Sequence, residues 1–299
     1  KACQKRMKDN NLKDEMALQS YFIQRIEKYL NSKGKQIIGW DEILEGGLAP
    51  NAAVMSWRGT EGGIEAAHLH HPVVMTPGSH CYFDHYQGNP RQEPIAIGGF
   101  TSLEKVYSFH PIPEKLTLEE RAYILGAQGN VWTEYINTSR DVEYMAVPRM
   151  SALAEVLWTN EVSRNYIHFT ERLTEFSGLL KKMDVNMAHS WQRPVLSTVA
   201  QNGVLKAEAK PPVPGKKMMY ELTKPGMKIN GAKMEYVAPV DLIDKNIQFR
   251  VWVDENDSTR YESSLNIRSS LASAKQVSFA KAPSEHYPGK GGFTLVDGI

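Results

Sequence analysis

The sequence contains only two cysteines, Cys3 and Cys81, in 299 residues. Two cysteines are too few for a disulfide scaffold, and no Cys/His spacing along the chain resembles a zinc site. An excess of charge of one sign is also lacking, because 35 basic and 34 acidic residues nearly cancel. We therefore expect neither nucleic acid nor an anionic membrane surface as a partner, and no metal or other cofactor.

Long hydrophobic runs are missing as well. No stretch approaches the roughly 18 to 20 consecutive apolar residues that a membrane-spanning helix needs. The first residues, 1–13, are too polar and charged for a signal peptide. Because this beginning reads as internal to a longer chain, it leaves export open. The hydrophobic content of 41% and the charged content of 23% are those of an ordinary globular protein.

What the sequence does contain is a regular alternation of helical and strand-like segments. Apolar residues recur every four positions from Leu18 to Leu30 and predict an amphipathic helix over residues 14–32. Short apolar runs without polar alternation predict parallel strands that are covered on both faces. These runs occupy residues 36–40, 52–57, 72–76 and 124–132. With further helices predicted over 141–158 and 166–183, the pattern indicates an α/β fold.

The character of the sequence changes after Gly203. A Pro-rich segment over residues 210–215 marks a loop, and alternating runs at 247–253 and 264–267 predict antiparallel strands. We expect residues 203–282 to form a small, sandwich-like antiparallel β domain. The Gly-rich residues 283–299 are predicted to be a linker and the start of a further β domain.

Aromatic residues stand at the C-terminal end of each predicted parallel strand, where parallel α/β barrels carry their functional residues. Three of the four ends also carry a carboxylate. The candidates, in chain order, are Trp40, Asp41, Glu42, Trp57, Tyr82, Asp84, Trp132 and Glu134. A tryptophan here can merely plug the mouth of a barrel. Three of them beside acidic residues favour a carbohydrate pocket, since indoles stack on pyranose faces and carboxylates accept hydroxyl protons.

The spacing of the carboxylates leaves their individual roles open. They could form a glycosidase acid pair, accept hydrogen bonds from substrate hydroxyls, or pair with Arg58 and Arg149. The histidines His68, His70 and His71 precede a predicted strand and so belong to the opposite end of a barrel. We expect no metal site there.

Four motifs together resemble the family 20 β-N-acetylhexosaminidases. They are Ile38–Glu42 (IGWDE), Val54–Gly59 (VMSWRG), Tyr82–Asp84 (YFD) and Gly126–Glu134 (GAQGNVWTE). Each motif is short, but all four occur in the family's order and spacing over about the first 185 residues. The resemblance implies that residues 1–190 are the C-terminal half of a (β/α)8 TIM barrel, strands 5 to 8, followed by a small C-terminal β domain.

The resemblance also implies a mechanism. In this family the 2-acetamido oxygen of the sugar attacks its own anomeric carbon, so the reaction retains configuration and needs no enzyme nucleophile. This is one of the exceptions to the usual two-carboxylate scheme. By resemblance, Trp40, Trp57 and Trp132 would wall the acetamido pocket, and Tyr82 would donate its hydroxyl to the acetamido oxygen.

Asp84 and Glu134 would, by the same resemblance, hold sugar hydroxyls at the far side of the ring. The family's general acid lies in an adjacent Asp-Glu pair at the end of the fourth strand, and that motif has no match here. Asp41 and Glu42 belong to the fifth-strand motif, so the acid role is not transferred to them. The family's sugar-binding arginine from the first strand is absent too.

A whole barrel takes eight strands and roughly 250 residues, so we expect this chain to be a fragment cut at both ends. The intact enzyme would remove terminal N-acetylhexosamine from glycans, whereas the fragment alone would be inactive. Its open half-barrel would self-associate with a second copy, be completed by a missing segment, or make the fragment poorly soluble. The alternatives are a non-catalytic glycan-binding fragment and a structural part of a cell-surface assembly. The resemblance further implies a periplasmic, cell-surface or secreted location.

Overall fold

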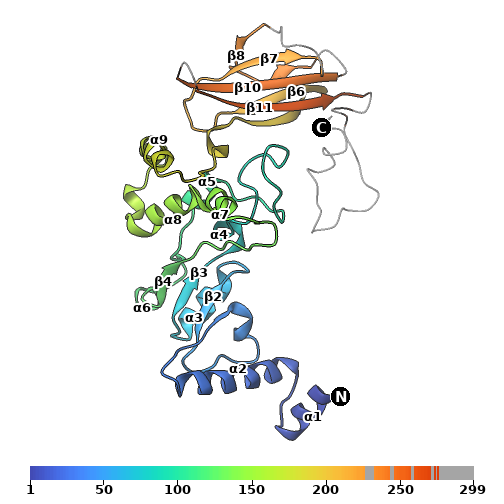
Figure 1. The fold of residues 1–299 in the computed structure, drawn as a ribbon. Coiled ribbons are helices and arrows are strands. Elements are labelled where there is room, and N and C mark those ends of the chain that lie inside the picture. Colours follow the sequence, from blue (N-terminus) through green and yellow to red (C-terminus); the bar gives the residue numbers. More distant parts are fainter. Residues whose placement is uncertain (226–231, 243–245, 257–258, 271–272, 274, 276–299) are drawn as a thin grey trace. The chain divides into compact units, whose positions relative to one another are not determined.

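A computed structural model describes residues 1–225, 232–242, 246–256, 259–270, 273 and 275 (Figure 1). The chain divides into two compact units, Lys1–Ala188 and His189–Ile299, called unit 1 and unit 2 below. The segment predicted to be a linker and a further β domain, 283–299, lies outside the described residues. Among the described residues, no helix is at once long and apolar enough to cross a membrane.

Unit 1 begins with helices α1 (Ala2–Asp9) and α2 (Glu15–Asn31). The Asp14 side chain caps α2 by accepting a hydrogen bond from the Ala17 amide at 2.8 Å, which satisfies one of the free N–H groups of the first turn. Two polar residues on the buried side of α2 hold a neighbouring loop. Ser20 donates to the Gly47 carbonyl at 2.6 Å, and Glu27 accepts from the Asn51 amide at 2.5 Å. The helix predicted over 14–32 is confirmed.

The centre of unit 1 is a parallel sheet with strands in the order β1-β2-β3-β4. These strands are β1 (Ile38–Trp40), β2 (Ala53–Ser56), β3 (Val73–Met75) and β4 (Ile124–Ala127). All four predicted strands are present, and the α/β class is confirmed. The prediction for β4 was too long, because β3 ends at Met75 and leaves the chain beyond Gln128 without a continuous partner.

Helix α3 (Glu61–His68) follows β2 and packs on β2 and β3 (Figure 1). Its buried face consists largely of small side chains, and Ala66 and Ala67 are fully covered. Small side chains let the helix approach the sheet closely over the buried Val54 and Val73. The sheet is therefore covered by this helix as a βα unit requires.

The remaining helices of unit 1 follow β3 and β4. They are α4 (Gly78–Cys81), α5 (Leu103–Tyr107), α6 (Leu118–Arg121), α7 (Ser139–Ala146), α8 (Arg149–Trp158) and α9 (Tyr166–Lys182), with 3-10 turns η1 (Asp41–Leu44) and η2 (Glu161–Ser163). The prediction of a single helix over residues 141–158 is wrong in one respect, because the structure has two helices there. The helical segment is interrupted at Pro148, which has no N–H to donate and so separates α7 from α8. The helix predicted over 166–183 is confirmed by α9.

Unit 2 consists mainly of antiparallel strands after the turn η3 (Ser190–Gln192). One sheet has the order β5-β6-β9 and the other β11-β10-β7-β8. Their bounds are β5 (Val195–Gln201), β6 (Val204–Lys210), β7 (Met219–Thr223), β8 (Met234–Glu235), β9 (Val240–Asp241), β10 (Asn246–Asn256) and β11 (Thr259–Arg268). Buried side chains of both sheets, such as Ala207, Phe249 and Ile267, share one hydrophobic core.

Unit 2 starts earlier than residue 203, where the predicted β domain begins. Asn202 and Gly203 form the two-residue turn between β5 and β6, with φ of 53° and 74°. An Asn-Gly pair suits such a turn because both positions need positive φ. The change of character at Gly203 therefore marks the middle of a hairpin rather than a domain boundary.

Candidate functional site

Four aromatic side chains come together at the C-terminal ends of the four parallel strands. Trp40 ends β1, Trp57 directly follows β2, Tyr82 follows α4 beyond β3, and Trp132 lies on the segment after β4. The ring centroids of Trp40 and Trp132 are 5.6 Å apart, and those of Trp57 and Tyr82 are 6.2 Å apart. The first and last motifs therefore meet, and so do the two middle ones.

Tyr82 is the one side chain of these two ring pairs that carries a hydroxyl group. Burial raises the pKa of Tyr82, while hydrogen bonding to the side chains of Trp132 and Asn130 acts in the opposite direction. The phenol thus keeps its proton at neutral pH and remains a hydrogen-bond donor. The pairs Trp40–Trp132 and Trp57–Tyr82 are together called the aromatic cluster below. Trp132 is 43% exposed, so the cluster is open to a ligand on that side.

Backbone pairing between two distant loops positions Tyr82. The amide of Phe83 donates to the Asn130 carbonyl, and the amide of Asn130 donates to the Cys81 carbonyl, each at 2.7 Å. This isolated parallel bridge extends the β3–β4 pairing beyond the ends of the strands. The Asn130 amide group also donates to the Thr76 hydroxyl at the end of β3. The loops that carry Tyr82 and Trp132 are therefore fixed to each other.

Asp84 and Glu134 lie in different surroundings. Asp84 is 5% exposed, and its Oδ1 has no hydrogen-bond partner among the described residues. Burial raises the pKa of Asp84, and the negative charge of Glu134 raises it further, while the charges of His85 and Arg149 act in the opposite direction. Glu134 itself is exposed. A buried acceptor without a donor is costly to a fold, so Asp84 is suited to receive a hydroxyl group from a ligand.

Arg149 is a residue of this site for which the sequence predicts only a general role as a charge partner. Its fully buried guanidinium donates to the carbonyl oxygens of Phe83, His85, Thr101 and Met145, and it lies over the Phe83 ring at 5.2 Å. Burial lowers the pKa of Arg149 to about 9, so it stays charged at neutral pH. It holds the backbone on both sides of Asp84. An arginine within the apolar stretch of α8 is the one sequence signal that could have identified it.

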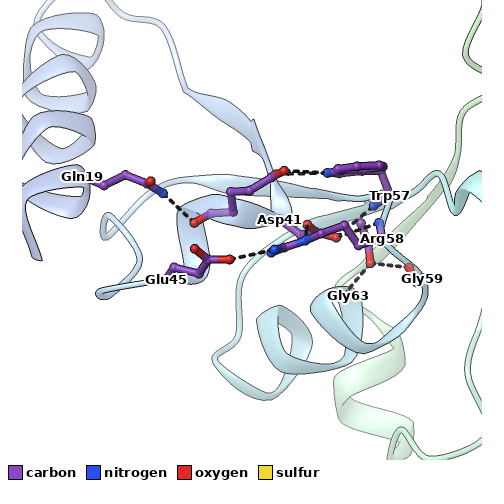
Figure 2. A network of polar contacts seen from close by, with 9 residues as sticks. Gln19, Asp41, Glu45, Trp57, Arg58, Gly59 and Gly63 are labelled. Carbon is purple, nitrogen blue, oxygen red and sulfur yellow. Dashed lines mark hydrogen bonds and ion pairs between the residues drawn. The ribbon is translucent and has the colours of Figure 1, made fainter. Parts of the chain in front are cut away.

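The structure assigns structural partners to both carboxylates that follow β1. Asp41, 2% exposed, accepts hydrogen bonds from the amide of Trp57 at 3.0 Å, the amide of Arg58 at 3.2 Å and the Arg58 Nε at 2.6 Å (Figure 2). Glu42 accepts the indole N–H of Trp57, with distances of 3.0 and 3.1 Å to its two oxygens. Of the roles left open by the sequence, pairing with Arg58 is the one Asp41 adopts.

The three histidines that precede β3, His68, His70 and His71, do not converge on one point. His68 Nδ1 lies 2.5 Å from a Glu120 carboxylate oxygen, His71 Nδ1 lies 2.8 Å from the Ala52 carbonyl, and the His70 ring packs against Tyr123. Within the part of the chain that the structure describes, no group of three or more His, Cys, Asp or Glu side chains is placed to hold a metal ion.

Comparison with known proteins extends these observations. Residues 1–161 match the family model described as glycosyl hydrolase family 20, catalytic domain. A β-hexosaminidase of Porphyromonas gingivalis is 56% identical over 172 residues, which are 57% of this chain and 22% of that protein. A β-hexosaminidase of Vibrio furnissii is 32% identical over 157 residues, 51% of this chain and 25% of that protein.

A solved structure shares the fold. The family 20 exo-β-N-acetylglucosaminidase of Vibrio harveyi, determined in complex with N-acetylglucosamine, has a TM-score of 0.58 and 30% identity, covering 64% of this chain and 30% of that one. The chain thus spans less than a third of the length of these relatives. The match to the catalytic-domain model nevertheless covers more than half of the chain, and it confirms the resemblance carried by the four motifs. The chain belongs to glycosyl hydrolase family 20.

Proposed function

We propose that this chain is the second half of the catalytic (β/α)8 barrel of a β-N-acetylhexosaminidase, followed by a small β domain. The observation that carries the proposal is the aromatic cluster, in which four rings from four consecutive strand ends meet. Indole and phenol faces suit the apolar methyl of an acetamido group, and the Tyr82 hydroxyl supplies a donor for its carbonyl oxygen. The reaction of the intact enzyme would be removal of terminal N-acetylhexosamine from glycans.

The chemistry follows from what such a pocket can do. The acetamido oxygen would attack the anomeric carbon as the glycosidic bond breaks, giving a cyclic oxazolinium intermediate that water then opens with retention of configuration. Holding this nucleophile close to the anomeric carbon converts a bimolecular attack into an intramolecular one. The Tyr82 hydroxyl would orient the acetamido oxygen, and the three indoles would restrict its rotation.

Asp84 and Glu134 would bind hydroxyl groups of the same sugar. The unpartnered Oδ1 of Asp84 supports this role, because a sugar hydroxyl would supply the missing donor. The polar groups would thus fix the sugar while the aromatic cluster holds its acetamido group.

The chain has no general acid for the leaving oxygen in this proposal. Asp41 and Glu42 are engaged by Trp57 and Arg58, and the family's Asp-Glu motif has no match in the sequence. General acid catalysis contributes on the order of 10² to 10⁴ in rate. We expect the intact enzyme to release nitrophenol from nitrophenyl N-acetyl-β-glucosaminide and the 299-residue chain alone to be at least about 100-fold slower.

Two results would contradict this proposal. Turnover by the 299-residue chain comparable to that of the intact enzyme would show that the acid lies within it. An intact protein that binds N-acetylglucosamine in calorimetry but never cleaves the nitrophenyl glycoside would instead support the glycan-binding alternative.

The open edges of the half-barrel affect whether the 299-residue chain associates with copies of itself. β1 and β4 are the outer strands of the described sheet, and Ile38 and Leu125 on them are 48% and 67% exposed. Open strand edges with apolar side chains favour pairing with another chain. The proposal is that the separate 299-residue chain self-associates, which light scattering would detect as a mass above 33.7 kDa; a monodisperse monomer would contradict it.

A periplasmic, surface or secreted location of the intact enzyme is also part of the proposal, and cell fractionation would check it.

A further inference from the structure

The motif Asp41-Glu42 contributes two carboxylates that bind no substrate in the proposed function. Glu42 faces the edge of the Trp57 ring, and its two oxygens receive the indole N–H at 3.0 and 3.1 Å. In Figure 2 these bonds are marked by dashed lines at the indole nitrogen of Trp57. The N–H is the single polar group of a tryptophan side chain. A hydrogen bond at that position therefore fixes the direction in which the ring plane points.

Asp41 fixes the backbone of the same residue. Its Oδ2 accepts from the Trp57 amide, and the bonds to the amide and Nε of Arg58 hold Asp41 itself in place. Asp41 is nearly completely buried, so these bonds are shielded from competing water. Consecutive carboxylates at the end of β1 thus hold the main chain and the ring of Trp57 separately.

The backbone of Glu42 is held in place by its neighbours. Glu42 lies in the turn η1 between the buried Asp41 and Ile43. The Gln19 side chain of α2 donates to the Glu42 carbonyl at 2.7 Å, so a neighbouring helix ties this turn down (Figure 2). Glu42 also faces the aromatic cluster. Burial, followed by the charges of Asp84 and Glu42, raises the pKa of Tyr82.

We infer that Glu42 is a positioning residue that holds Trp57 in the wall of the acetamido pocket and thereby sets which N-acyl groups the pocket accepts. The inference rests on the proposed function for the identity of the ligand. Glu42 acts through Trp57 and does not touch the sugar. Sites of this kind require their walls to be held to within about 0.5 Å by supporting bonds. A ring free to rotate would widen the pocket and admit a larger acyl group.

Orientation of Trp57 is tested without any ligand. In the intact enzyme labelled with fluorotryptophan, the Trp57 resonance is identified by its loss in Trp57→Phe. Glu42→Ala should shift and broaden this resonance, whereas Glu42→Gln, which keeps an acceptor oxygen, should leave it near its original position. Glu45→Ala is the matched control. It removes a carboxylate at the end of the same turn that binds Arg58 Nη1 at 2.7 Å, and it should leave the resonance unchanged.

Acyl selectivity is the second readout. The ratio of affinities for N-acetyl- and N-propanoyl-glucosamine, measured by calorimetry on the intact enzyme, should fall by about tenfold in Glu42→Ala, since one methylene in a tight apolar pocket is worth about 10- to 200-fold. Glu42→Gln should recover most of the ratio. In a Trp57→Phe background, Glu42→Ala should have no further effect, because the two residues act through one bond.

Three outcomes overturn the inference: an unshifted Trp57 resonance in Glu42→Ala, an unchanged acyl ratio, or fully additive effects of the two substitutions. Failure of the proposed function looks different. An unsubstituted enzyme that binds neither sugar would refute the acetamido pocket and with it the selectivity claim, while the fluorine resonance would still decide whether Glu42 orients Trp57.

Discussion

In unit 1 the buried Arg149 donates to backbone carbonyl oxygens, three of them in loops and one in α7, whereas in unit 2 Arg250 donates to carboxylates of the strands beside it. Arg250 bonds Glu221 on β7 at 2.6 Å and Glu262 on β11 at 2.6 to 2.9 Å. Glu221 is 2% exposed. Arg149 is fully buried and Arg250 is partly buried, and the two satisfy different kinds of acceptor.

The difference follows from strand length. The strands of unit 1 have 3 or 4 residues, so much of its buried backbone lies in loops that need side-chain donors. In unit 2, β10 and β11 have 11 and 10 residues and pair with each other along an antiparallel ladder over nearly their whole length. Charged side chains there are left to pair with one another. The candidate site is thus formed by loops that the Arg149 side chain holds in place, whereas the long sheet of unit 2 contributes to stability.

Substitution of the two arginines should give the largest effects and separates the two units. Arg149→Ala would leave several buried carbonyl oxygens without donors, and Arg250→Ala would leave the buried Glu221 charge unpaired. Each should cost about 3 to 5 kcal/mol in unfolding free energy, measured by urea denaturation of the intact enzyme. Only Arg149→Ala should also weaken N-acetylglucosamine binding in the molecules that remain folded.

Conservative substitutions serve as controls for that comparison. Arg149→Lys keeps one charged donor and should recover part of the stability, but not the full set of carbonyl bonds. If Arg250→Ala weakened sugar binding as much as Arg149→Ala at matched stability, the division of labour between the units would be wrong.

Tyr82→Phe should have the next largest effect, and it should be confined to chemistry. Loss of a hydrogen-bond donor to a reacting oxygen costs about 10² to 10³ in rate. We expect kcat/KM of the intact enzyme for the nitrophenyl glycoside to fall by about 100-fold while its melting temperature changes little. A matched change in unit 2, Tyr220→Phe, should leave both quantities nearly unaltered. A fall of less than about threefold in Tyr82→Phe would contradict the role given to its hydroxyl.

Asp84→Asn should give the smallest free-energy change of these substitutions, and it should stabilise the fold where the arginine substitutions destabilise it. The pKa of Asp84 is raised by burial above 3.8, so its charge destabilises the folded state at neutral pH, and this cost disappears below pH 3.8, where the group is protonated folded and unfolded. Asp84→Asn should therefore stabilise the enzyme by ~1 kcal/mol at neutral pH and weaken sugar binding. Melting temperatures recorded from neutral pH downward should converge with those of the unsubstituted enzyme.

A constant gain in melting temperature at every pH would show that Asp84 carries no buried charge. A gain without any loss of sugar affinity would remove Asp84 from the binding site while leaving its electrostatics intact.

Many of the helices and strands could be predicted, because short stretches of sequence determine them. The four-residue repeat of α2 and the uninterrupted apolar runs of β1 to β4 follow from short stretches of sequence. The break at Pro148 was local too, but the strong apolar pattern on both sides of it masked the missing N–H. Gly203 indicates a boundary only when the strand before it is ignored; together with that strand, Asn202-Gly203 is the turn of a hairpin.

Long-range bonds were out of reach of such reasoning. The bonds from Arg149 to the Phe83 carbonyl and from the Trp57 indole to Glu42 join residues 66 and 15 positions apart, and nothing in the local sequence marks them. The aromatic residues of the candidate site were found because parallel strands end on the same side of a sheet. The side chains that hold those residues in place could be identified only from the structure.

The most direct test of the central claim is saturation-transfer NMR of N-acetylglucosamine with the intact enzyme. If Trp40, Trp57, Tyr82 and Trp132 enclose the acetamido group, the acetyl methyl protons should receive the strongest saturation of the whole sugar, and glucose should show none. Equal saturation around the pyranose ring, or equal binding of glucose, would contradict the acetamido pocket.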